Sequence, residues 1–200
     1  MARRNFYLRY VKPVGDWCLS LILLLILLPF ITIITIILLL HYRSSPLFIQ
    51  ERVGRNESVF KLIKFKTMRV RDQEESTTGL SKLIRSYSID ELPQLLNVLI
   101  GNMSLIGPRP LLVEYLPHYN EEERKRHWLK PGITGWAQVN GRNSIDWGER
   151  MKLDVYYVNH ASFLLDCRIL MKSIVEVFKR DRTVYKDDKT IKFSDYAAER

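Results

Sequence analysis

One stretch of the chain carries no charged residue and is almost entirely apolar: Leu19–Leu40, LSLILLLILLPFITIITIILLL. A helix of this length would measure about 33 Å, which is enough to cross the hydrocarbon core of a bilayer. A cleaved signal peptide fits poorly, because the run is long and no small-residue cleavage site follows it. The residues that follow are His41, Tyr42 and Arg43 instead. The stretch therefore predicts a membrane segment.

Two features predict that this segment enters and leaves the membrane by the same face. Pro29 lies near its middle, where it removes one backbone hydrogen bond and clashes with the carbonyl of Leu25, so a bend is expected. Positively charged flanks prefer the cytoplasmic side, and both flanks are basic. We therefore predict a re-entrant helix broken at Leu28–Pro29, with a kinked single span as the alternative. The basic residues are Arg3, Arg4, Arg9 and Lys12 before the segment, and Arg43, Arg52, Arg55, Lys61, Lys64 and Lys66 after it.

Length and composition set the organisation of the rest. The chain has 200 residues, which predicts one domain plus an appendage. With 31 basic against 22 acidic residues the net charge is +9, which indicates anionic partners such as nucleic acid, lipid headgroups or phosphorylated substrates. Two cysteines make neither a disulfide framework nor a zinc site. We divide the chain into a membrane segment of residues 1–43, a membrane-associated domain of residues 44–180 and a charged tail of residues 181–200.

Local patterns predict an α+β fold that is mostly helical. Phe48–Val53 and Val59–Phe65 are expected to form a small β-hairpin around the turn signal Gly54–Asn56. The polar, non-periodic run Arg71–Gly79 predicts a loop. We also expect a loop over Lys130–Trp136, and at most a short strand over Ala137–Asn143. Helices are expected over residues 80–85, 90–99, 111–119, 121–127 and 145–159, with an irregular Gly107-Pro-Arg-Pro segment between them.

The last predicted helix, Phe163–Phe178, is amphipathic, because its apolar residues recur at spacings of three and four. Its apolar face is either part of the core or lies in the plane of the lipid headgroups. The second interpretation would place Lys172, Lys179 and Arg180 near phosphates. Tryptophans favour the membrane interface, and they are present at Trp128, Trp136 and Trp147.

The adjacent carboxylates Asp90 and Glu91 are the strongest candidates for chemistry. They lie in Ile84-Arg-Ser-Tyr-Ser-Ile-Asp-Glu-Leu-Pro-Gln-Leu. Local pattern alone favours a capping role, since Ser88-x-x-Glu91 matches a capping box and Asp90 suits an N-cap. The two roles are compatible, because free N–H groups at a helix N-terminus attract phosphate.

Basic residues accompany these carboxylates. Lys64 and Lys66 alternate along a predicted strand and share one face, and the pattern does not choose between them. Arg109 stands between Pro108 and Pro110, which restricts its backbone. A rigid arginine suits bidentate phosphate recognition.

Several long motifs in one order resemble those of the monotopic bacterial phosphoglycosyl transferases, also called bacterial sugar transferases or polyprenyl-phosphate sugar-phosphate transferases. The resemblance covers most of the chain, and the length is similar to the small members of the Campylobacter protein-glycosylation type. The family's helix break often reads Ser-Pro, whereas this chain has Leu28–Pro29. The motifs are Lys64-Phe-Lys-Thr-Met, Arg85-Ser-x-Ser-Ile-Asp-Glu-Leu-Pro-Gln-Leu, Asn97-Val-Leu, Asn102-Met-Ser-Leu-Ile-Gly-Pro-Arg-Pro, Lys130-Pro-Gly-Ile-Thr-Gly-Trp-Ala-Gln-Val-Asn-Gly-Arg-Asn and Asp154-Val-Tyr-Tyr.

The resemblance implies an Mg²⁺-dependent enzyme that moves a phosphosugar from a UDP-sugar to undecaprenyl phosphate and releases UMP. It implies a monotopic protein whose catalytic domain lies on the cytoplasmic face of the bacterial inner membrane, with no nucleic-acid partner. Asp90 would be the nucleophile and Glu91 a metal ligand beside it, although adjacent carboxylates can exchange these roles. Arg85, Arg109 and Lys64 or Lys66 would bind phosphate, and the nucleotide or sugar would meet Gln138, Asn140, Arg142 and Asn143.

Two other functions stay open at this stage. A glycosyl transferase would move the sugar without its phosphate and release UDP. A membrane-tethered basic module would bind anions without turnover, and neutralising Asp90 would leave that binding intact.

Overall fold

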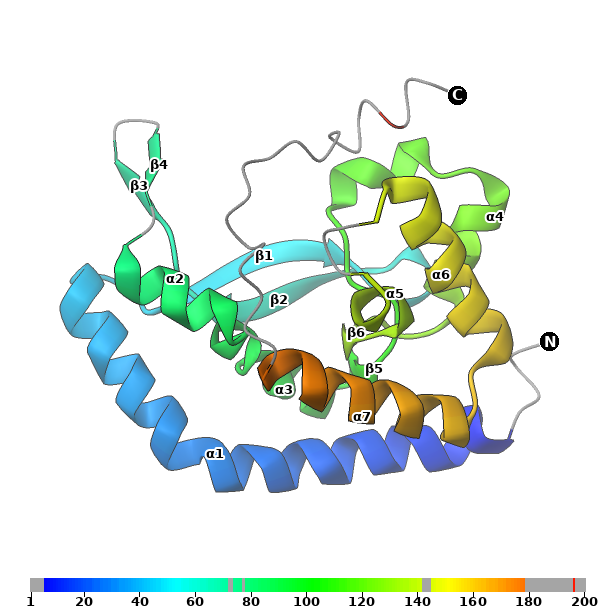
Figure 1. Cartoon of the computed structure of the whole chain (residues 1–200), viewed down its shortest axis with the longest axis horizontal. Coiled ribbons are helices and arrows are strands. Elements are labelled where there is room, and N and C mark those ends of the chain that lie inside the picture. Colours follow the sequence, from blue (N-terminus) through cyan, green and yellow to red (C-terminus); the bar gives the residue numbers. More distant parts are fainter. Residues whose placement is uncertain (1–5, 72–73, 77, 142–144, 179–195, 197–200) are drawn as a thin grey trace.

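The computed structural model describes residues 6–71, 74–76, 78–141, 145–178 and 196. The long helix α1 (Lys12–Tyr42) lies along one edge of the molecule, and the hairpin and the shorter helices pack above it (Figure 1). The described part is thus mostly helical with small sheets, as predicted. The strands are β1 (Leu47–Val53), β2 (Val59–Phe65), β3 (Arg69–Arg71), β4 (Glu74–Ser76), β5 (Ser104–Ile106) and β6 (Gly132–Thr134), and the other α-helices are α2 (Gly79–Ser86), α3 (Gln94–Ile100), α4 (Glu121–Arg124), α5 (Trp136–Val139), α6 (Trp147–His160) and α7 (Phe163–Phe178).

Short helices of other types connect these elements. A π-helical turn, η2 (Tyr7–Val11), leads directly into α1. The remaining short helices are 3₁₀ turns: η3 (Arg55–Glu57), η4 (Ile89–Glu91), η5 (Val113–His118) and η6 (Lys125–Trp128).

Helix α1 is continuous through Pro29, and its ribbon changes direction about midway along its length (Figure 1). Thr32 Oγ1 donates to the carbonyl of Leu28 at 2.8 Å, and Thr35 Oγ1 donates to that of Ile31 at 2.7 Å. Such back-bonding satisfies hydroxyl groups in an apolar segment and bends helices. Neither bond reaches the carbonyl of Leu25, which Pro29 deprives of its usual partner. The structure thus has a bent helix, and the re-entrant path stays a prediction.

The start of α1 is joined to the C-terminal helices by one buried carboxylate. Asp166, on α7, accepts from Lys12 Nζ at 2.7 Å and from the Tyr7 hydroxyl at 2.6 Å through Oδ2. Its Oδ1 accepts from the hydroxyl of Tyr157, on α6, at 2.7 Å. A buried carboxylate with three charge-assisted partners fixes the relative positions of these elements. Lys12 is therefore part of a structural contact, although the sequence analysis counted it as a flanking charge.

The apolar surface of α1 and α7 is largely uncovered. The 36 residues from Tyr7 to Tyr42 are long and apolar enough to cross a membrane, yet only 11% of the most apolar window is buried. A helix that formed the core of a soluble protein would be mostly buried, so this exposure supports membrane association. On α7, Leu164 is 79% exposed and Met171 is 64% exposed. Ile169 of the same helix is fully buried, so α7 contributes to the core while much of its apolar surface is uncovered.

The hairpin formed by β1 and β2 confirms the predicted strands and turn. The strands are antiparallel and in register from Leu47 opposite Phe65 to Val53 opposite Val59. Asn97, on α3, attaches the hairpin to the helical layer: its Oδ1 accepts from Ile63 N at 3.0 Å and its Nδ2 donates to Lys61 O at 2.7 Å. Asn97 is fully buried, so the two bonds satisfy a polar side chain that would otherwise be costly.

Four predictions about the polar segments were wrong. Within the predicted loop Arg71–Gly79, β4 pairs with β3, which ends at Arg71. The predicted loop Lys130–Trp136 contains β6, and the segment from Ala137 forms part of α5 instead of a strand. The helix predicted over residues 90–99 is divided into η4 and α3, because Pro93 precedes the first residue of α3. Strand pairing overrode the local pattern at β4 and β6, and proline geometry did so before α3.

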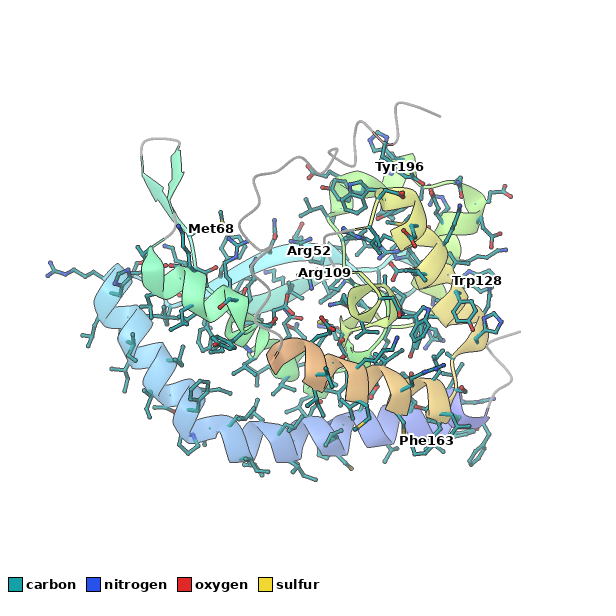
Figure 2. All side chains as sticks on the ribbon, in the orientation of Figure 1. Arg52, Met68, Arg109, Trp128, Phe163 and Tyr196 are labelled. Atoms are coloured by element: carbon teal, nitrogen blue, oxygen red, sulfur yellow. The ribbon has the colours of Figure 1, made fainter. Side chains whose placement is uncertain are left out.

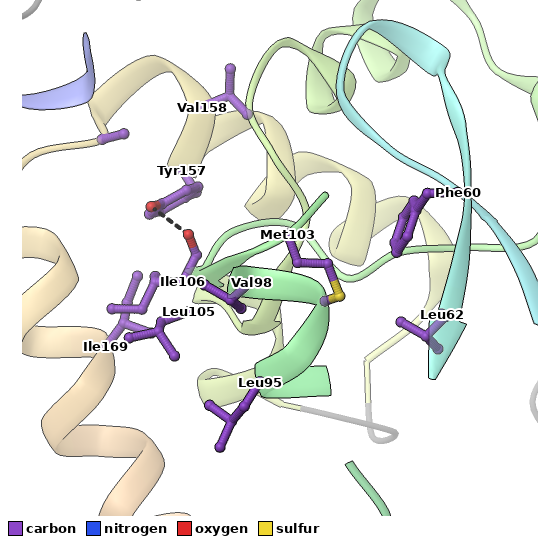
Figure 3. Packing of buried hydrophobic residues seen from close by; sticks show 11 residues of the cluster. Phe60, Leu62, Leu95, Val98, Met103, Leu105, Ile106, Tyr157, Val158 and Ile169 are labelled. Carbon is purple, nitrogen blue, oxygen red and sulfur yellow. Dashed lines mark hydrogen bonds between the residues drawn. The ribbon is translucent and has the colours of Figure 1, made fainter. Parts of the chain in front are cut away.

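The main core lies where α3, β5, α6 and α7 meet under the hairpin. Figure 3 shows Leu95, Val98 and Met103 close to Phe60 and Leu62 of β2, with Ile169 approaching from α7. The hydroxyl of Tyr157 donates to the carbonyl of Ile106 at 3.2 Å within this core (Figure 3). Leu23, Leu24 and Leu27 of α1 pack against the same cluster. One face of the membrane segment is therefore part of the core.

Three glycines allow two loop segments to touch backbone to backbone. β5 and β6 are parallel, with Ser104 paired to Gly132 and Ile106 to Thr134. A Cβ on Gly107 would lie 2.3 Å from Lys130 O, one on Gly132 would lie 2.1 Å from Gly107 N, and one on Gly135 would lie 2.1 Å from Gly107 O. These contacts involve rigid backbone atoms, so larger residues cannot be accommodated by rotating a side chain.

We expect Gly132→Ala to lower the free energy of unfolding by at least about 2 kcal/mol, because the added methyl group must displace backbone. Gly79→Ala is the matched control, since a Cβ at Gly79 meets no atom within 4 Å. Thermal unfolding of detergent-solubilised protein measures both variants. Equal melting temperatures for the two would contradict the close contact.

Candidate active site

A cavity of about 570 Å³ opens between the hairpin, α1 and the C-terminal helices. Leu23 and Leu27 of α1 and Leu170 of α7 contribute apolar wall, so the cavity adjoins the membrane-facing elements. Its charged lining residues come from elements that are distant in sequence: Arg52, Lys64, Arg85, Asp90, Glu91, Arg109, Arg150, Asp154 and Glu176.

The chain enters this site through an unusual backbone turn at Ser88. Its φ of 56° is left-handed, and its side chain makes no capping hydrogen bond. The following residues form η4, which carries Asp90 and Glu91, and α3 begins only after Pro93. The capping interpretation of these carboxylates was therefore wrong. A strained residue at this position indicates that the turn serves to place η4 rather than to begin a helix.

The surroundings of the Asp90 side chain disfavour its ionised form. Among the described residues, no hydrogen bond or ion pair to its side chain is present. Burial and the neighbouring Glu91 raise the pKa of Asp90 to about 6, while Lys64, Arg109 and Arg85 oppose the rise. Because this pKa lies below 7, Asp90 is mainly ionised at neutral pH, and its raised basicity favours nucleophilic attack.

Glu91 is held by Arg109, so the two adjacent carboxylates have different surroundings. Arg109 Nη2 donates to Glu91 Oε1 at 2.7 Å, and the proximity of Glu91 raises the pKa of Arg109. Arg126 in turn donates from Nη2 to the carbonyl of Arg109 at 2.7 Å and to Asp154 Oδ2 at 2.7 Å. Arg126 and Asp154 are both fully buried. This buried pair fixes the backbone of Arg109 and thereby the position of Glu91.

The structure separates the two lysines that the sequence left as alternatives. Lys64 lines the cavity, and burial together with Arg52 and Arg109 lowers its pKa against the opposing effect of Asp90. Lys66 lies outside the cavity lining, with Nζ 3.3 Å from Ser44 Oγ and 5.8 Å from the centre of the Tyr42 ring. The predicted alternation therefore does not place both ammonium groups at the carboxylates.

Two cavity arginines were missed by the sequence analysis. Arg52, on β1, donates to Gln50 Oε1 at 2.6 Å and to Pro110 O at 3.4 Å, and burial near Arg109 lowers its pKa. Arg150 precedes Asp154 by four residues on α6, so both lie on one helix face. This spacing could have identified Arg150 from the sequence. Nothing in the local sequence of Arg52 distinguished it from a flanking surface charge, because the isolated bridge between Arg52 and Leu112 is long-range.

The residues predicted to contact the nucleotide or sugar differ in their position relative to the cavity. Gln138 lines the cavity, where Nε2 donates to Ile133 O at 3.0 Å, and Oε1 is buried without a hydrogen-bond partner among the described residues. Asn140 lies outside the lining and accepts at Oδ1 from Lys172 Nζ at 2.7 Å. Lys172 also lies 4.9 Å from the centre of the Trp136 ring, so it points to the protein and not to lipid phosphates. Arg142 and Asn143 lie outside the described residues, as do Lys179 and Arg180.

Asp90 and Glu91 are suited to a divalent cation that binds together with a phosphate group. In the described part of the chain, no group of three or more potential metal ligands is found. Mg²⁺ commonly binds one or two carboxylates and takes its other ligands from substrate phosphates and water. Asp90 and Glu91 line the same cavity, and their mutual repulsion is the kind that a divalent cation relieves. The residues therefore fit such an ion.

Comparisons with known proteins match most of the chain. The family model described as bacterial sugar transferase matches residues 7–180. The chain is 50% identical over 143 residues to an uncharacterised sugar transferase, EpsL, of Bacillus subtilis, which covers 67% of this chain and 71% of that protein. It is 38% identical to the undecaprenyl-phosphate glucose phosphotransferase of Komagataeibacter xylinus over 85% of this chain, and 33% identical to the UDP-glucose:undecaprenyl-phosphate glucose-1-phosphate transferase of Escherichia coli over 85%. It spans only 36% and 40% of these two proteins.

We expect Asp90→Asn to raise the melting temperature at pH 8 and to have a smaller effect at pH 4.5. The folded-state pKa of Asp90, about 6, lies above the ordinary aspartate value of 3.8. The cost of burying its ionised form therefore grows as the pH rises from about 4 to about 6, is complete above that pH, and disappears as the pH falls back toward 4. Thermal unfolding across this range measures the difference.

Glu91→Gln is the comparison variant: it removes the ion pair to Arg109 as well as the repulsion of Asp90, so it should stabilise the fold less than Asp90→Asn at pH 8. An Asp90→Asn variant that is destabilised at pH 8 would contradict the buried, unpaired state of this carboxylate.

Proposed function

Because the chain belongs to the bacterial sugar transferase family, we propose that it transfers a sugar phosphate from a UDP-sugar to undecaprenyl phosphate at the first membrane step of glycoconjugate biosynthesis. The products are UMP and undecaprenyl-diphosphate-sugar. Relatives whose names state this type of reaction support the proposal. The observation that carries it is the placement of Asp90, an unpaired carboxylate among cations, in a cavity walled partly by the membrane helix.

The first step that we propose is covalent. A carboxylate oxygen of Asp90 attacks the β-phosphorus of the UDP-sugar, and the bond from this phosphorus to the oxygen that bridges to the α-phosphate breaks. UMP leaves with that electron pair, and an acyl phosphate that carries the sugar remains on Asp90. Covalent catalysis divides a transfer between two bulky anions into two steps.

The second step returns Asp90 to its starting state. A phosphate oxygen of undecaprenyl phosphate attacks the same phosphorus, and the bond from phosphorus to the Asp90 oxygen breaks. A diphosphate linkage forms, and Asp90 leaves as a carboxylate. The apolar wall formed by Leu23, Leu27 and Leu170 supports entry of a lipid acceptor from the membrane side.

The cations around Asp90 would neutralise the phosphate groups during both steps. Lys64, Arg85 and Arg109 line the cavity near Asp90, and each lowers its pKa electrostatically. Preorganised charges of this kind stabilise developing charge in a site that excludes water. Mg²⁺, held by Glu91 with Asp90 beside it, would supply Lewis-acid neutralisation of the diphosphate. Gln138 is the described candidate for the nucleotide or sugar, because its Oε1, which has no partner within the described part of the chain, can accept a hydrogen bond.

The membrane arrangement is part of the same proposal. The helix Tyr7–Tyr42 would enter and leave the bacterial inner membrane by its cytoplasmic face, and α7 would lie at the interface. The bend in α1 and the exposed apolar residues of both helices support this arrangement (Figure 1).

We expect the purified protein, given a UDP-sugar, undecaprenyl phosphate and Mg²⁺, to release UMP. Asp90→Asn should reduce this release at least about a thousandfold, because it removes the nucleophile. Chromatography of the nucleotide products measures both. Release of UDP would indicate a glycosyl transferase, and full activity of Asp90→Asn would exclude the covalent step at this residue.

The two lysines provide a matched pair. Lys64→Gln should lower kcat/KM by about tenfold or more, since a charge-assisted contact to phosphate contributes about 1.5–3 kcal/mol. Lys66→Gln should stay within about twofold of wild type, because Lys66 lies outside the cavity lining. Steady-state rates of UMP release compare them. Equal losses, or a larger loss for Lys66→Gln, would contradict the assignment of Lys64.

A further inference from the structure

A second cavity, of about 890 Å³, lies at the start of the membrane helix. Among the residues that the structure describes, the two cavities have no lining residue in common. The second is formed by the beginning of α1, the turn η3, the junction of α3 with β5, and the segment after η6. Figure 2 labels Trp128 on the same side of the molecule as the N-terminal end of α1. The lining residues are Leu8, Arg9, Lys12, Pro13, Asp16, Trp17, Arg55, Asn56, Val98, Gly101, Met103, Ser104, Trp128, Leu129 and Lys130.

The charges in this cavity do not balance. Lys12 is paired with Asp166 at 2.7 Å and lies 3.6 Å from Asp16, whose Oδ2 also accepts from the Ser104 hydroxyl. Arg9, Arg55 and Lys130 remain, and in the part of the chain that the structure describes none of them forms an ion pair with a carboxylate. The cavity therefore carries an excess of positive charge.

Two of these cations, Arg55 and Lys130, line the same cavity. Glu57, two residues after Arg55, accepts from Arg124 Nη1 at 2.7 Å. The carboxylate nearest to Arg55 in the sequence on this side is therefore paired with another arginine. Burial and the nearby Arg55 lower the pKa of Lys130, with Asp16 opposing the effect. A Cβ on Gly101 would lie 3.6 Å from Lys130 Nζ, so the ammonium group lies close to this backbone. Two like charges in one cavity are the arrangement that an anion stabilises.

The uncharged wall indicates that the anion belongs to a lipid. Leu8, Pro13, Val98, Met103 and Leu129 contribute apolar lining. Trp17 is 47% exposed and Trp128 is 46% exposed, and indoles of this kind favour the headgroup level of a bilayer. The cavity lies just before the apolar run of α1, where the proposed membrane arrangement would place the lipid phosphates. Its volume exceeds what a lone phosphate needs and suits a headgroup with the first part of its chains.

We infer that this second cavity binds an anionic membrane phospholipid, with its phosphate between Arg55 and Lys130 and its glycerol and upper acyl chains against Trp17 and Leu129. The bound lipid would join the start of α1 to the segment Trp128–Lys130. It would stabilise the protein in an anionic membrane. The acceptor of the proposed transfer is a different lipid, since it must reach Asp90 in the other cavity.

Titration of the full-length protein in a neutral detergent tests this inference. The probe is dihexanoyl phosphatidylglycerol, the comparison lipid is dihexanoyl phosphatidylcholine, and the readout is the melting temperature. Wild type should show a saturable rise with phosphatidylglycerol and little change with phosphatidylcholine. Arg55→Gln/Lys130→Gln should bind the anionic lipid at least about tenfold more weakly, because two charge-assisted contacts are lost.

Lys61→Gln/Lys152→Gln is the matched control, since it removes the same charge from two exposed positions outside both cavities. It should bind like wild type. Arg55→Gln alone, at an exposed position, provides a second variant if the double variant does not fold, and it should also weaken binding.

Three results would overturn the inference. Equal shifts for the two lipids, or for the double variant and its control, would remove the role of the cations. Saturation by inorganic phosphate alone would indicate a site for soluble anions. A shift with undecaprenyl phosphate but not with phosphatidylglycerol would assign the cavity to the acceptor. Because the readout is stability, it is independent of UMP release, and failure of one proposal does not imply failure of the other.

Discussion

The arrangement of the site depends on backbone contact between two segments that are about 25 residues apart in sequence. Gly107 meets the stretch from Lys130 to Gly135 so closely that side chains on Gly107, Gly132 or Gly135 would overlap main-chain atoms. The parallel pairing of β5 with β6 holds this contact in register. Arg109 lies two residues after Gly107. Helix α5, which carries Gln138, begins directly after Gly135. This backbone contact therefore positions Arg109 and Gln138 at the same cavity.

Near this contact the site contains buried charges that cost folding free energy when no substrate is bound. Asp90 is buried beside Glu91, and its pKa is raised to about 6 in spite of three nearby cations. The buried pair Arg126–Asp154 adds no charge to the site, yet it fixes the carbonyl of Arg109. Buried ion pairs are weak sources of stability but can fix one geometry. The energetic cost is consistent with a site organised for substrate phosphates rather than for the free protein.

The parts of the fold that local pattern determines were predictable from sequence. The hairpin, α2, α6 and α7 follow from alternation or from helical periodicity, and all four are present. The strand β6, the helix α5 and the ladder of β3 with β4 depend on contacts between segments, and they were missed. Asp90 and Glu91 were found by motif, but their supposed role as helix caps was wrong because Pro93 delays the helix. Arg52 and Arg126 were missed because only tertiary contacts distinguish them from surface charges.

The membrane helix contributes to the site as well as to the anchor. Leu23 and Leu27 line the cavity that contains Asp90, so a lipid acceptor and the reactive carboxylate would meet at the surface of α1. The central claim is that Asp90 carries the sugar phosphate between donor and acceptor. Mass spectrometry of peptides, after incubation with UDP-sugar and Mg²⁺ but without acceptor, tests it most directly. We expect a phosphosugar adduct on Asp90 that undecaprenyl phosphate removes. Turnover without any adduct on this residue, or an adduct elsewhere that the acceptor discharges, would contradict it.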